Sequence, residues 1–280
     1  MIVDTNVYLL RWPFRRLPGD EPEALLAKLR QRNVAQAWAG SFDGMLHRDI
    51  AGVNLRLAQA CRADGQGVLV PFGSVNPKLP DWQEDIRRCQ EVHKMVGIRL
   101  HPNYHRYRLD DPVFAELLQL ATDRRLIVQL ALCMEDERTQ SPLMRVPPVD
   151  ITPLAEVVKS MPGLRLELLN CHSNPSREEY RKIVAAGNVY TEISMVEGVA
   201  GVGRYVREMP LSRVLFGSYY PFFNFESALL KIQESGLDAA SQKAICEDNV
   251  RGLMELAASP RSGRGPVAPG EAVRLEPLHF

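Results

Sequence analysis

The strongest constraint on the fold is an alternation of short apolar runs with longer segments of helical period. The runs are rich in Val, Ile and Leu, and they cover residues 2–10, 34–42, 68–75, 96–102, 126–133, 164–172, 188–194 and 213–218. Such alternation is typical of βα units that build a parallel sheet. Eight strands with intervening helices in about 250 residues predict one (β/α)8 TIM barrel, an α/β fold. An open doubly wound sheet is the alternative, but no glycine-rich phosphate loop follows any run.

Helices are expected between these runs, over residues 21–32, 48–63, 111–124, 225–235 and 249–259. Pro22, Pro112 and Pro153 lie near helix starts, where the missing N–H costs little. After residue 258 the sequence becomes rich in Gly and Pro, which disfavours a core element. We therefore expect a single barrel domain over residues 1–258 and an irregular tail over residues 259–280.

The charge balance argues against a nucleic acid or membrane partner. Lys+Arg and Asp+Glu are both 34, so the net charge is +0 and no basic surface is expected. The first residues, "MIVDTNVYLL", lack a basic region and are too polar for a signal peptide or a membrane span. The five cysteines are widely spaced, without a CxxC pair, so neither a disulfide framework nor a zinc ribbon is indicated. We expect a soluble cytoplasmic protein with a small-molecule ligand.

The candidate site consists of polar residues near the carboxyl ends of the runs, because these ends converge on one pocket in a TIM barrel. Alternate residues of a strand share a face. This spacing directs one group of side chains to the pocket: Asp4, Asn6, Tyr8, Arg99, His101, Asn170, His172, Glu192, Ser194, Ser218 and Tyr219. Structural roles stay open for some of them. Asp4 could cap backbone N–H groups, and Arg99 with Glu192 could form an internal ion pair.

Several further residues have two interpretations. His101 and His172 could be satisfied core histidines or catalytic groups, and their placement at two strand ends favours the second role. His105 and Tyr107 follow the fourth run and could reach over a ligand, or lie solvated on a loop. The longest irregular connection, residues 133–150, could be a lid or a passive insertion.

Several phrases of the sequence resemble the amidohydrolase-related family, a TIM-barrel group of metal-dependent hydrolases and decarboxylases. They are "MIVDTN", "GIRLHP" at residues 97–102, "NVYTEIS", "RVLFGSYYPF" and "ICEDNVRGLMEL". The eighth-strand phrase is the most specific of these. The likeness spans about residues 1–256, which is nearly all of the expected barrel.

The resemblance implies a divalent metal bound by paired histidines on the first strand, by histidines on the fifth and sixth strands, and by an aspartate on the eighth. This sequence departs from that pattern at the matching positions. Asn6 and Tyr8 replace the first pair, Ala131 (or Gln129, if the register shifts by two) stands on the fifth strand, Asn170 on the sixth and Tyr219 on the eighth. We therefore expect no cofactor, with a zinc-type site built from Asp4, His172 and Glu192 as the alternative.

Three functions follow from these residues. The first is a metal-independent hydrolase or lyase acting on a small carbonyl or carboxylate compound. The second is a catalytically inactive binding or regulatory protein that keeps the barrel. The third is a metal-dependent hydrolase with an atypical site. The resemblance also suggests a homodimer.

The first hypothesis assigns a role to each candidate. His101 and His172 would act as general acid or base, with Asp4 as a further catalytic group. Tyr219 or Tyr8 would donate a hydrogen bond to an oxyanion. Arg99 would bind a carboxylate. The remaining candidates would contact the substrate, namely Asn6, Tyr8, Asn170, Glu192 and Ser218.

Overall fold

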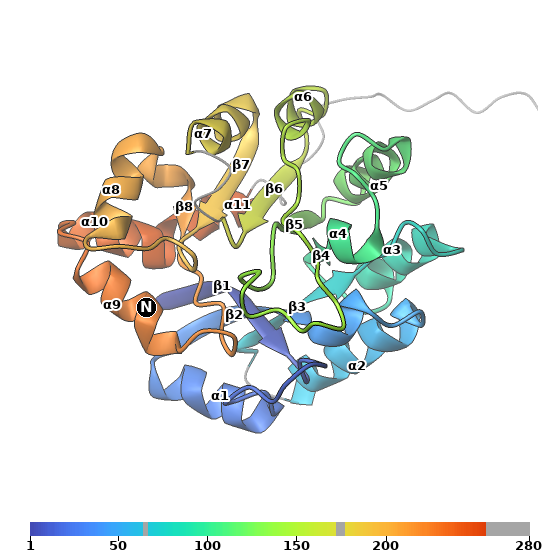
Figure 1. The fold of residues 1–280 in the computed structure, drawn as a ribbon, viewed down its shortest axis with the longest axis horizontal. Helices are drawn as coiled ribbons and strands as arrows, with labels where there is room; N and C mark the ends of the chain where they lie inside the picture. Colours follow the sequence, from blue (N-terminus) through green and yellow to red (C-terminus); the bar gives the residue numbers. More distant parts are fainter. Residues whose placement is uncertain (64–66, 172–176, 256–280) are drawn as a thin grey trace, which may run out of the picture.

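The computed structural model describes residues 1–63, 67–171 and 177–255, and it confirms the predicted TIM barrel (Figure 1). Each strand pairs in parallel with the next along the chain, from the first to the eighth. The strands are β1 (Ile2–Leu9), β2 (Val34–Ser41), β3 (Leu69–Ser74), β4 (Gly97–Leu100), β5 (Ile127–Ala131), β6 (Arg165–Leu169), β7 (Asn188–Glu192) and β8 (Val214–Leu215).

Hydrogen bonds between β1 and the segment after β8 close the barrel. Thr5 N donates to Phe216 O at 2.9 Å, Tyr219 N to Asn6 O at 2.8 Å, and Tyr8 N to Tyr220 O at 3.0 Å. The segment therefore continues the ladder although β8 itself has only two residues. This places Tyr219 directly beside the carboxyl half of β1.

Helices surround the strands, as Figure 1 shows. The helices are α1 (Pro22–Gln31), α2 (Ile50–Ala63), α3 (Trp82–Glu91), α4 (Pro102–His105), α5 (Pro112–Asp123), α6 (Leu154–Lys159), α7 (Arg177–Ala186), α8 (Gly201–Glu208), α9 (Phe225–Gln233), α10 (Ala239–Lys243) and α11 (Asn249–Glu255), with short helical turns η1 (Phe42–Met45), η2 (Leu211–Arg213) and η3 (Ala244–Asp248). In α5 the buried residues are Phe114, Leu117, Leu118 and Ala121, which recur at helical spacing and form one apolar stripe. Such stripes pack the helices onto the barrel.

The observed strands end earlier than the predicted runs. His101, Cys171 and Ser194 lie beyond the last paired residue of β4, β6 and β7. Strand pairing stops where the chain turns outward to the next helix. The polar residues at the ends of the predicted runs therefore lie at the mouth of the barrel. His172, the expected tail over residues 259–280 and the end of the expected helix 249–259 lie outside the described residues.

The long connection after β5 contains no helix or strand between Ala131 and Leu154. It is the yellow-green loop that crosses the centre of Figure 1. Its Met134 carbonyl accepts a hydrogen bond from Tyr219, and its Pro147 carbonyl accepts one from Asn103. The loop is therefore fixed to the barrel mouth at two places. Its role as a lid stays a prediction.

None of the five cysteines, all of which lie in the described ranges, forms a disulfide bond. No described helix combines the length and the apolar character that crossing a membrane requires.

Candidate functional site

Aromatic side chains fill the barrel axis at the carboxyl end of the strands. Tyr8, Phe42 and Tyr219 are almost completely buried there and belong to one apolar cluster. The rings of Tyr8 and Tyr219 meet edge to face, with centroids 5.8 Å apart, and Phe42 stacks on Tyr8 at 4.8 Å. The two tyrosines that stand at expected metal-binding positions therefore pack on each other.

The hydroxyl groups of these tyrosines bond within the protein. Tyr8 Oη lies 3.0 Å from His101 Nε2, and Tyr219 Oη donates to Met134 O at 2.6 Å. Burial raises the pKa of both phenols, and it lowers the pKa of His101 well below the usual histidine range. All three side chains are therefore neutral near pH 7. The cavity that His101 lines has a volume of only about 10 Å³, which is room for one water molecule at most.

Arg99 lies below this aromatic layer and has no exposed surface. Its guanidinium donates to Gln129 Oε1 at 2.8 Å and to the backbone carbonyls of Val7, Thr5 and Trp38 at 2.8, 3.3 and 3.0 Å. It also stacks under the Tyr8 ring, 4.5 Å from the centroid. Backbone dipoles and an amide surround this cation, so the internal ion pair with Glu192 does not form.

A polar cluster joins β1, β6 and β7 on the other side of the axis. Asn6 Nδ2 donates to Asn170 Oδ1 at 2.8 Å and to Glu192 Oε1 at 3.3 Å. The same Glu192 oxygen accepts from Asn170 N at 2.6 Å and from Ser194 Oγ at 2.8 Å. The second Glu192 oxygen accepts from Ser194 N. The sequence-predicted residues Asn6, Asn170 and Glu192 do come together, and their polar atoms bond chiefly to one another.

Asp4 and Ser218 lie next to this cluster at the seam of the barrel. Asp4 Oδ1 accepts from Asn6 N at 3.1 Å and from Ser218 N at 3.0 Å, which is the capping role that the sequence left open. Asp4 Oδ2 has no partner among the described residues. Burial raises the pKa of Asp4 to about 7, so the carboxyl is partly protonated at neutral pH.

His105 and Tyr107 are buried instead of solvated. His105 Nε2 lies 2.9 Å from Gly44 O, and the Tyr107 ring stacks on Phe114 with centroids 5.8 Å apart. Neither contacts a cavity of substrate size.

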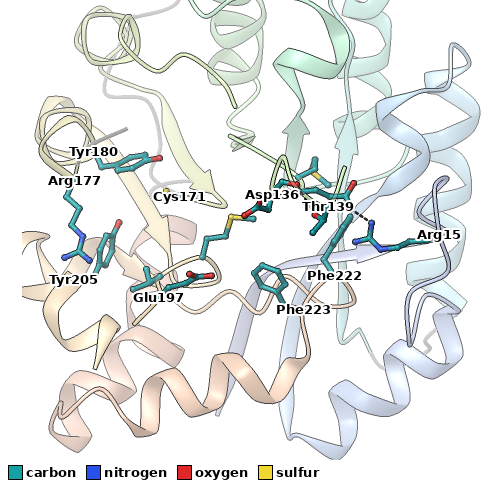
Figure 2. Close-up of a pocket in the computed structure, with 14 residues that line it drawn as sticks. Arg15, Asp136, Thr139, Cys171, Arg177, Tyr180, Glu197, Tyr205, Phe222 and Phe223 are labelled. Carbon is teal, nitrogen blue, oxygen red and sulfur yellow. Dashed lines mark hydrogen bonds and ion pairs between the residues drawn. The ribbon is translucent and has the colours of Figure 1, made fainter. Parts of the chain in front are cut away.

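A cavity of about 320 Å³ lies beside the axis, at the carboxyl ends of β5 to β8 (Figure 2). The connections after β1, β5, β7 and β8 and the helices α7 and α8 supply its walls. The lining residues include the apolar side chains Met134, Met195, Phe222 and Phe223, the phenols Tyr180 and Tyr205, and the charged side chains Arg15, Glu135, Asp136, Arg177 and Glu197.

The charged groups at this cavity are largely paired. Arg15 bonds to Glu135, and Arg177 Nη1 donates to Glu208 Oε1 at 3.0 Å. Tyr205 Oη donates to Thr191 Oγ1 at 2.8 Å. Sequence reasoning missed this cavity. In the sequence, Tyr180 and Tyr205 have the spacing of core residues on helix faces, and nothing marks them as cavity residues.

The fold and the position of the cavity place this chain among TIM barrels with a pocket at the carboxyl ends of the strands. A family model described as Amidohydrolase matches residues 8–253. The chain belongs to the amidohydrolase family, as the sequence resemblance predicted. A search of curated proteins finds no match.

Solved structures share the fold at low sequence identity. The 2,6-dihydroxybenzoate decarboxylase from Rhizobium superposes with a TM-score of 0.67 at 14% identity, covering 90% of this chain and 99% of that chain. A dihydroxybenzoic acid decarboxylase from Polaromonas, with bound manganese and the inhibitor 2-nitroresorcinol, gives 0.68 at 14% identity over 91% and 97%. A 5-carboxyvanillate decarboxylase from Novosphingobium aromaticivorans, complexed with manganese and 4-hydroxy-3-methoxy-5-nitrobenzoic acid, gives 0.68 at 12% identity over 91% and 96%.

Two of these structures hold manganese, which contradicts the expectation that this barrel has no cofactor. The described side chains nevertheless do not form a matching site. No group of three or more His, Cys, Asp or Glu residues that could hold a metal ion occurs in the described ranges. The oxygens of Glu192 already accept hydrogen bonds from Asn6, Asn170 and Ser194, and the buried carboxylate oxygens without a partner among the described residues are Asp4 Oδ2 and Glu167 Oε1. A divalent ion needs several converging donors, and the described side chains at the barrel axis do not supply them.

Proposed function

We propose that this chain binds a small compound with a carboxylate group in the cavity beside the barrel axis. Tyr8 and Tyr219 fill the barrel axis, and an open cavity lies beside them at the same end of the barrel. This combination is the observation that carries the proposal. Its volume of about 320 Å³ lies at the lower end of the range of ligand pockets, about 300–1,000 Å³. A ligand of one ring with its substituents would fit.

The residues that line the cavity suit a ligand with an aromatic ring and an anionic group. Phe222, Phe223 and Tyr205 offer ring surfaces, and Met195 supplies a soft apolar contact. Arg177 lies at one end and can pair with a carboxylate. The names of the structural neighbours, which are decarboxylases of hydroxylated or methoxylated benzoic acids, support the same ligand class.

A hydrolase or lyase reaction on such a carboxylate is the second candidate. The carboxyl of Asp4 favours it, because a pKa of about 7 and a free Oδ2 suit proton transfer at neutral pH. The catalytic roles predicted for Asp4, His101, His172 and Tyr219 belong to this candidate. The small space beside His101 weighs against it.

The test is calorimetric titration of the protein with benzoate, 2,6-dihydroxybenzoate and vanillate, with and without Mn²⁺, together with chromatography for products. We expect a Kd below about 1 mM for at least one compound, equivalent to about −4 kcal/mol. Product formation in the same samples would favour the second candidate.

A matched pair of variants locates the binding site. Thr139→Trp places a large ring at an exposed lining position of the cavity and should abolish binding. Thr152→Trp introduces the same ring at an exposed position outside the cavity and should bind as the wild type does. Absence of binding to the wild type under every condition, or equal binding by both variants, would contradict the proposal.

A further inference from the structure

Tyr180 presents an unused hydrogen-bond donor at the cavity. Its side chain is 2% exposed, and its hydroxyl has no hydrogen-bond partner among the described residues. A buried hydroxyl without a partner is unfavourable, so native structures rarely keep one without a reason. Tyr205 differs in this respect, because its hydroxyl bonds to Thr191. Figure 2 shows the Tyr180 hydroxyl directed toward the interior of the cavity.

Arg177 lies three residues before Tyr180 on α7, so both side chains extend from the same face of this helix. The guanidinium has five N–H donors, and its Nη1 donates to Glu208. Donors therefore remain for a second acceptor. Figure 2 shows Arg177, Tyr180 and Tyr205 together at one end of the cavity, while Arg15 lies at the other end beyond Phe222.

The charges around the cavity favour a monoanion over a dianion. Its lining contains two arginines, Arg15 and Arg177, and three carboxylates, Glu135, Asp136 and Glu197. Glu135 bonds to Arg15, and Asp136 pairs with Arg138 at 2.6 Å. The lining as a whole therefore has a charge of −1, from two positive and three negative groups. A phosphate dianion would be repelled more strongly than a carboxylate.

We propose that Tyr180 and Arg177 together form the anchor for the carboxylate of the ligand. Tyr180 Oη donates a hydrogen bond to a carboxylate oxygen, and the Arg177 guanidinium, which lies beside Tyr205 and pairs with Glu208, adds positive charge at the same end of the cavity, while the ring of the ligand extends toward Phe222 and Phe223. This inference rests on the proposed function and names the residues that recognise the anionic group. Burial raises the pKa of Tyr180, so its hydroxyl stays protonated and remains a donor throughout the neutral range.

The test compares 2,6-dihydroxybenzoate with its uncharged amide, 2,6-dihydroxybenzamide, in calorimetric titrations of four proteins. Tyr180→Phe removes a single oxygen atom and should weaken binding of the carboxylate about 10- to 100-fold, the range for a hydrogen bond to a charged group. Binding of the amide should change less than about 3-fold. Arg177→Gln should act in the same direction and reduce the salt dependence of carboxylate binding.

Tyr107→Phe is the matched control, because it also removes a buried hydroxyl without a partner but lies outside the cavity, so it should leave binding of the carboxylate unchanged. The unfolding midpoint of Tyr180→Phe should equal or exceed that of the wild type, because the removed hydroxyl has no partner. Wild-type affinity of Tyr180→Phe for the carboxylate, or equal weakening of carboxylate and amide, would overturn the anchor alone. If the wild type binds none of benzoate, 2,6-dihydroxybenzoate and vanillate, the proposed function fails and the anchor fails with it.

Discussion

Single residues at the barrel axis determine what this site can do. Tyr8 and Tyr219 stand where the resemblance implies a metal-binding histidine and aspartate, and their rings contact each other. Tyr219 also has a left-handed backbone, with φ of 58°, which is unfavourable for a bulky side chain. The hydrogen bond from its N–H to Asn6 O and the bond from its hydroxyl to Met134 O hold it in this conformation.

Substitution of Tyr219 tests whether the packing of aromatic rings at the barrel axis stabilises the folded protein. Tyr219→Phe keeps the ring contacts and leaves Met134 O without this donor, so we expect a loss of about 1–2 kcal/mol in the free energy of unfolding. Tyr219→Asp removes the ring contacts with Tyr8 and Phe222 and buries a carboxyl group, so it should cost at least about 4 kcal/mol. Urea unfolding measures both values. Wild-type stability of Tyr219→Asp would show that this position still accommodates the family's aspartate.

At the scale of elements, close backbone approach between α8 and the end of α9 limits which side chains α8 can contain. A Cβ atom on Gly203 would lie 2.0 Å from the backbone oxygen of Ser235, which follows α9. A backbone atom cannot move aside as a flexible side chain can. Since α8 also supplies Tyr205 to the cavity, this contact helps to set the position of the cavity wall.

Two glycines of α8 form a matched pair for this contact. Gly203→Ala should lower the free energy of unfolding by about 1–3 kcal/mol, because the steric overlap exceeds the gain in helix propensity. The Cβ atom of Gly201→Ala would meet only atoms of Val196, the nearest being Cγ1 at an ordinary contact distance of 3.5 Å, so the stability of this variant should be unchanged or slightly higher. Thermal and urea unfolding of both variants provide the comparison. Equal effects of the two substitutions would argue against the contact.

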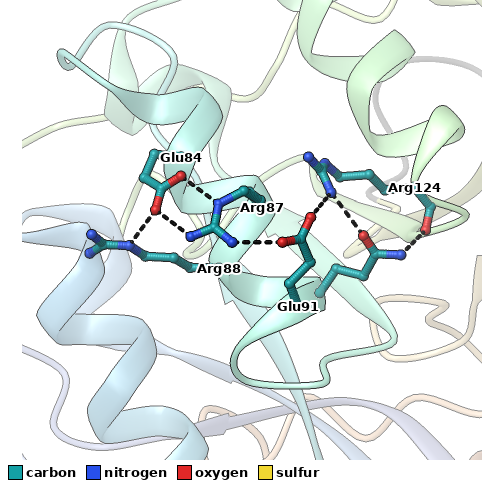
Figure 3. Close-up of polar contacts among 6 residues, drawn as sticks. Glu84, Arg87, Arg88, Glu91 and Arg124 are labelled. Atoms are coloured by element: carbon teal, nitrogen blue, oxygen red, sulfur yellow. Dashed lines mark hydrogen bonds and ion pairs between the residues drawn. The ribbon is translucent and has the colours of Figure 1, made fainter.

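At the scale of the whole molecule, stability depends on the interior of the barrel more than on surface charge. Glu84, Arg87 and Glu91 form a chain of ion pairs on α3, and Arg124 after α5 extends it at 2.7 Å from Glu91 (Figure 3). Exposed pairs of this kind contribute little. Inside the barrel, Glu167 is fully buried and accepts from Gln129 Nε2 at 2.7 Å. The expected homodimer and cytoplasmic location stay predictions.

The buried carboxyls predict a loss of stability with rising pH. Burial raises the pKa of Glu167 from 4.5 to about 8 and that of Asp4 from 3.8 to about 7. At a pH between the ordinary pKa of each group and its raised pKa, the folded state binds more protons than the unfolded state. The free energy of unfolding therefore decreases as pH rises from about 4 to 8. Arg99 and Glu192 have smaller, opposing effects on the pKa of Glu167.

Glu167→Gln mimics the protonated carboxyl and removes the contribution of Glu167 to the pH dependence of the free energy of unfolding. Between pH 5 and pH 8 the wild type should lose about 3 kcal/mol more stability than this variant, at about 1.4 kcal/mol per pKa unit. Urea unfolding at both pH values measures the difference. Glu234→Gln, at an exposed position, is the control and should follow the wild type. Parallel pH profiles of wild type and Glu167→Gln would contradict a raised pKa.

The sequence by itself determined the barrel and the identity of the residues at its axis. Apolar runs alternate with helical stripes, and hydrophobic periodicity is a local property, so strands and helices were predictable. The two-residue spacing also placed Asn6 and Tyr8 on the inner face of β1. The contacts of Asn6 with Asn170 and Glu192 followed from the convergence of parallel strands, although the sequence did not indicate which atoms would bond.

Only the tertiary structure decided where open space remains. Arg99 donates hydrogen bonds to backbone carbonyls of β1 and β2 and to Gln129, which periodicity did not indicate. Its assignment as a residue that binds a carboxylate stays a prediction. Tyr180 and Tyr205 looked like core residues and line the cavity. Whether a space is filled depends on how side chains from distant segments pack together, and periodicity along the chain contains no information about that packing.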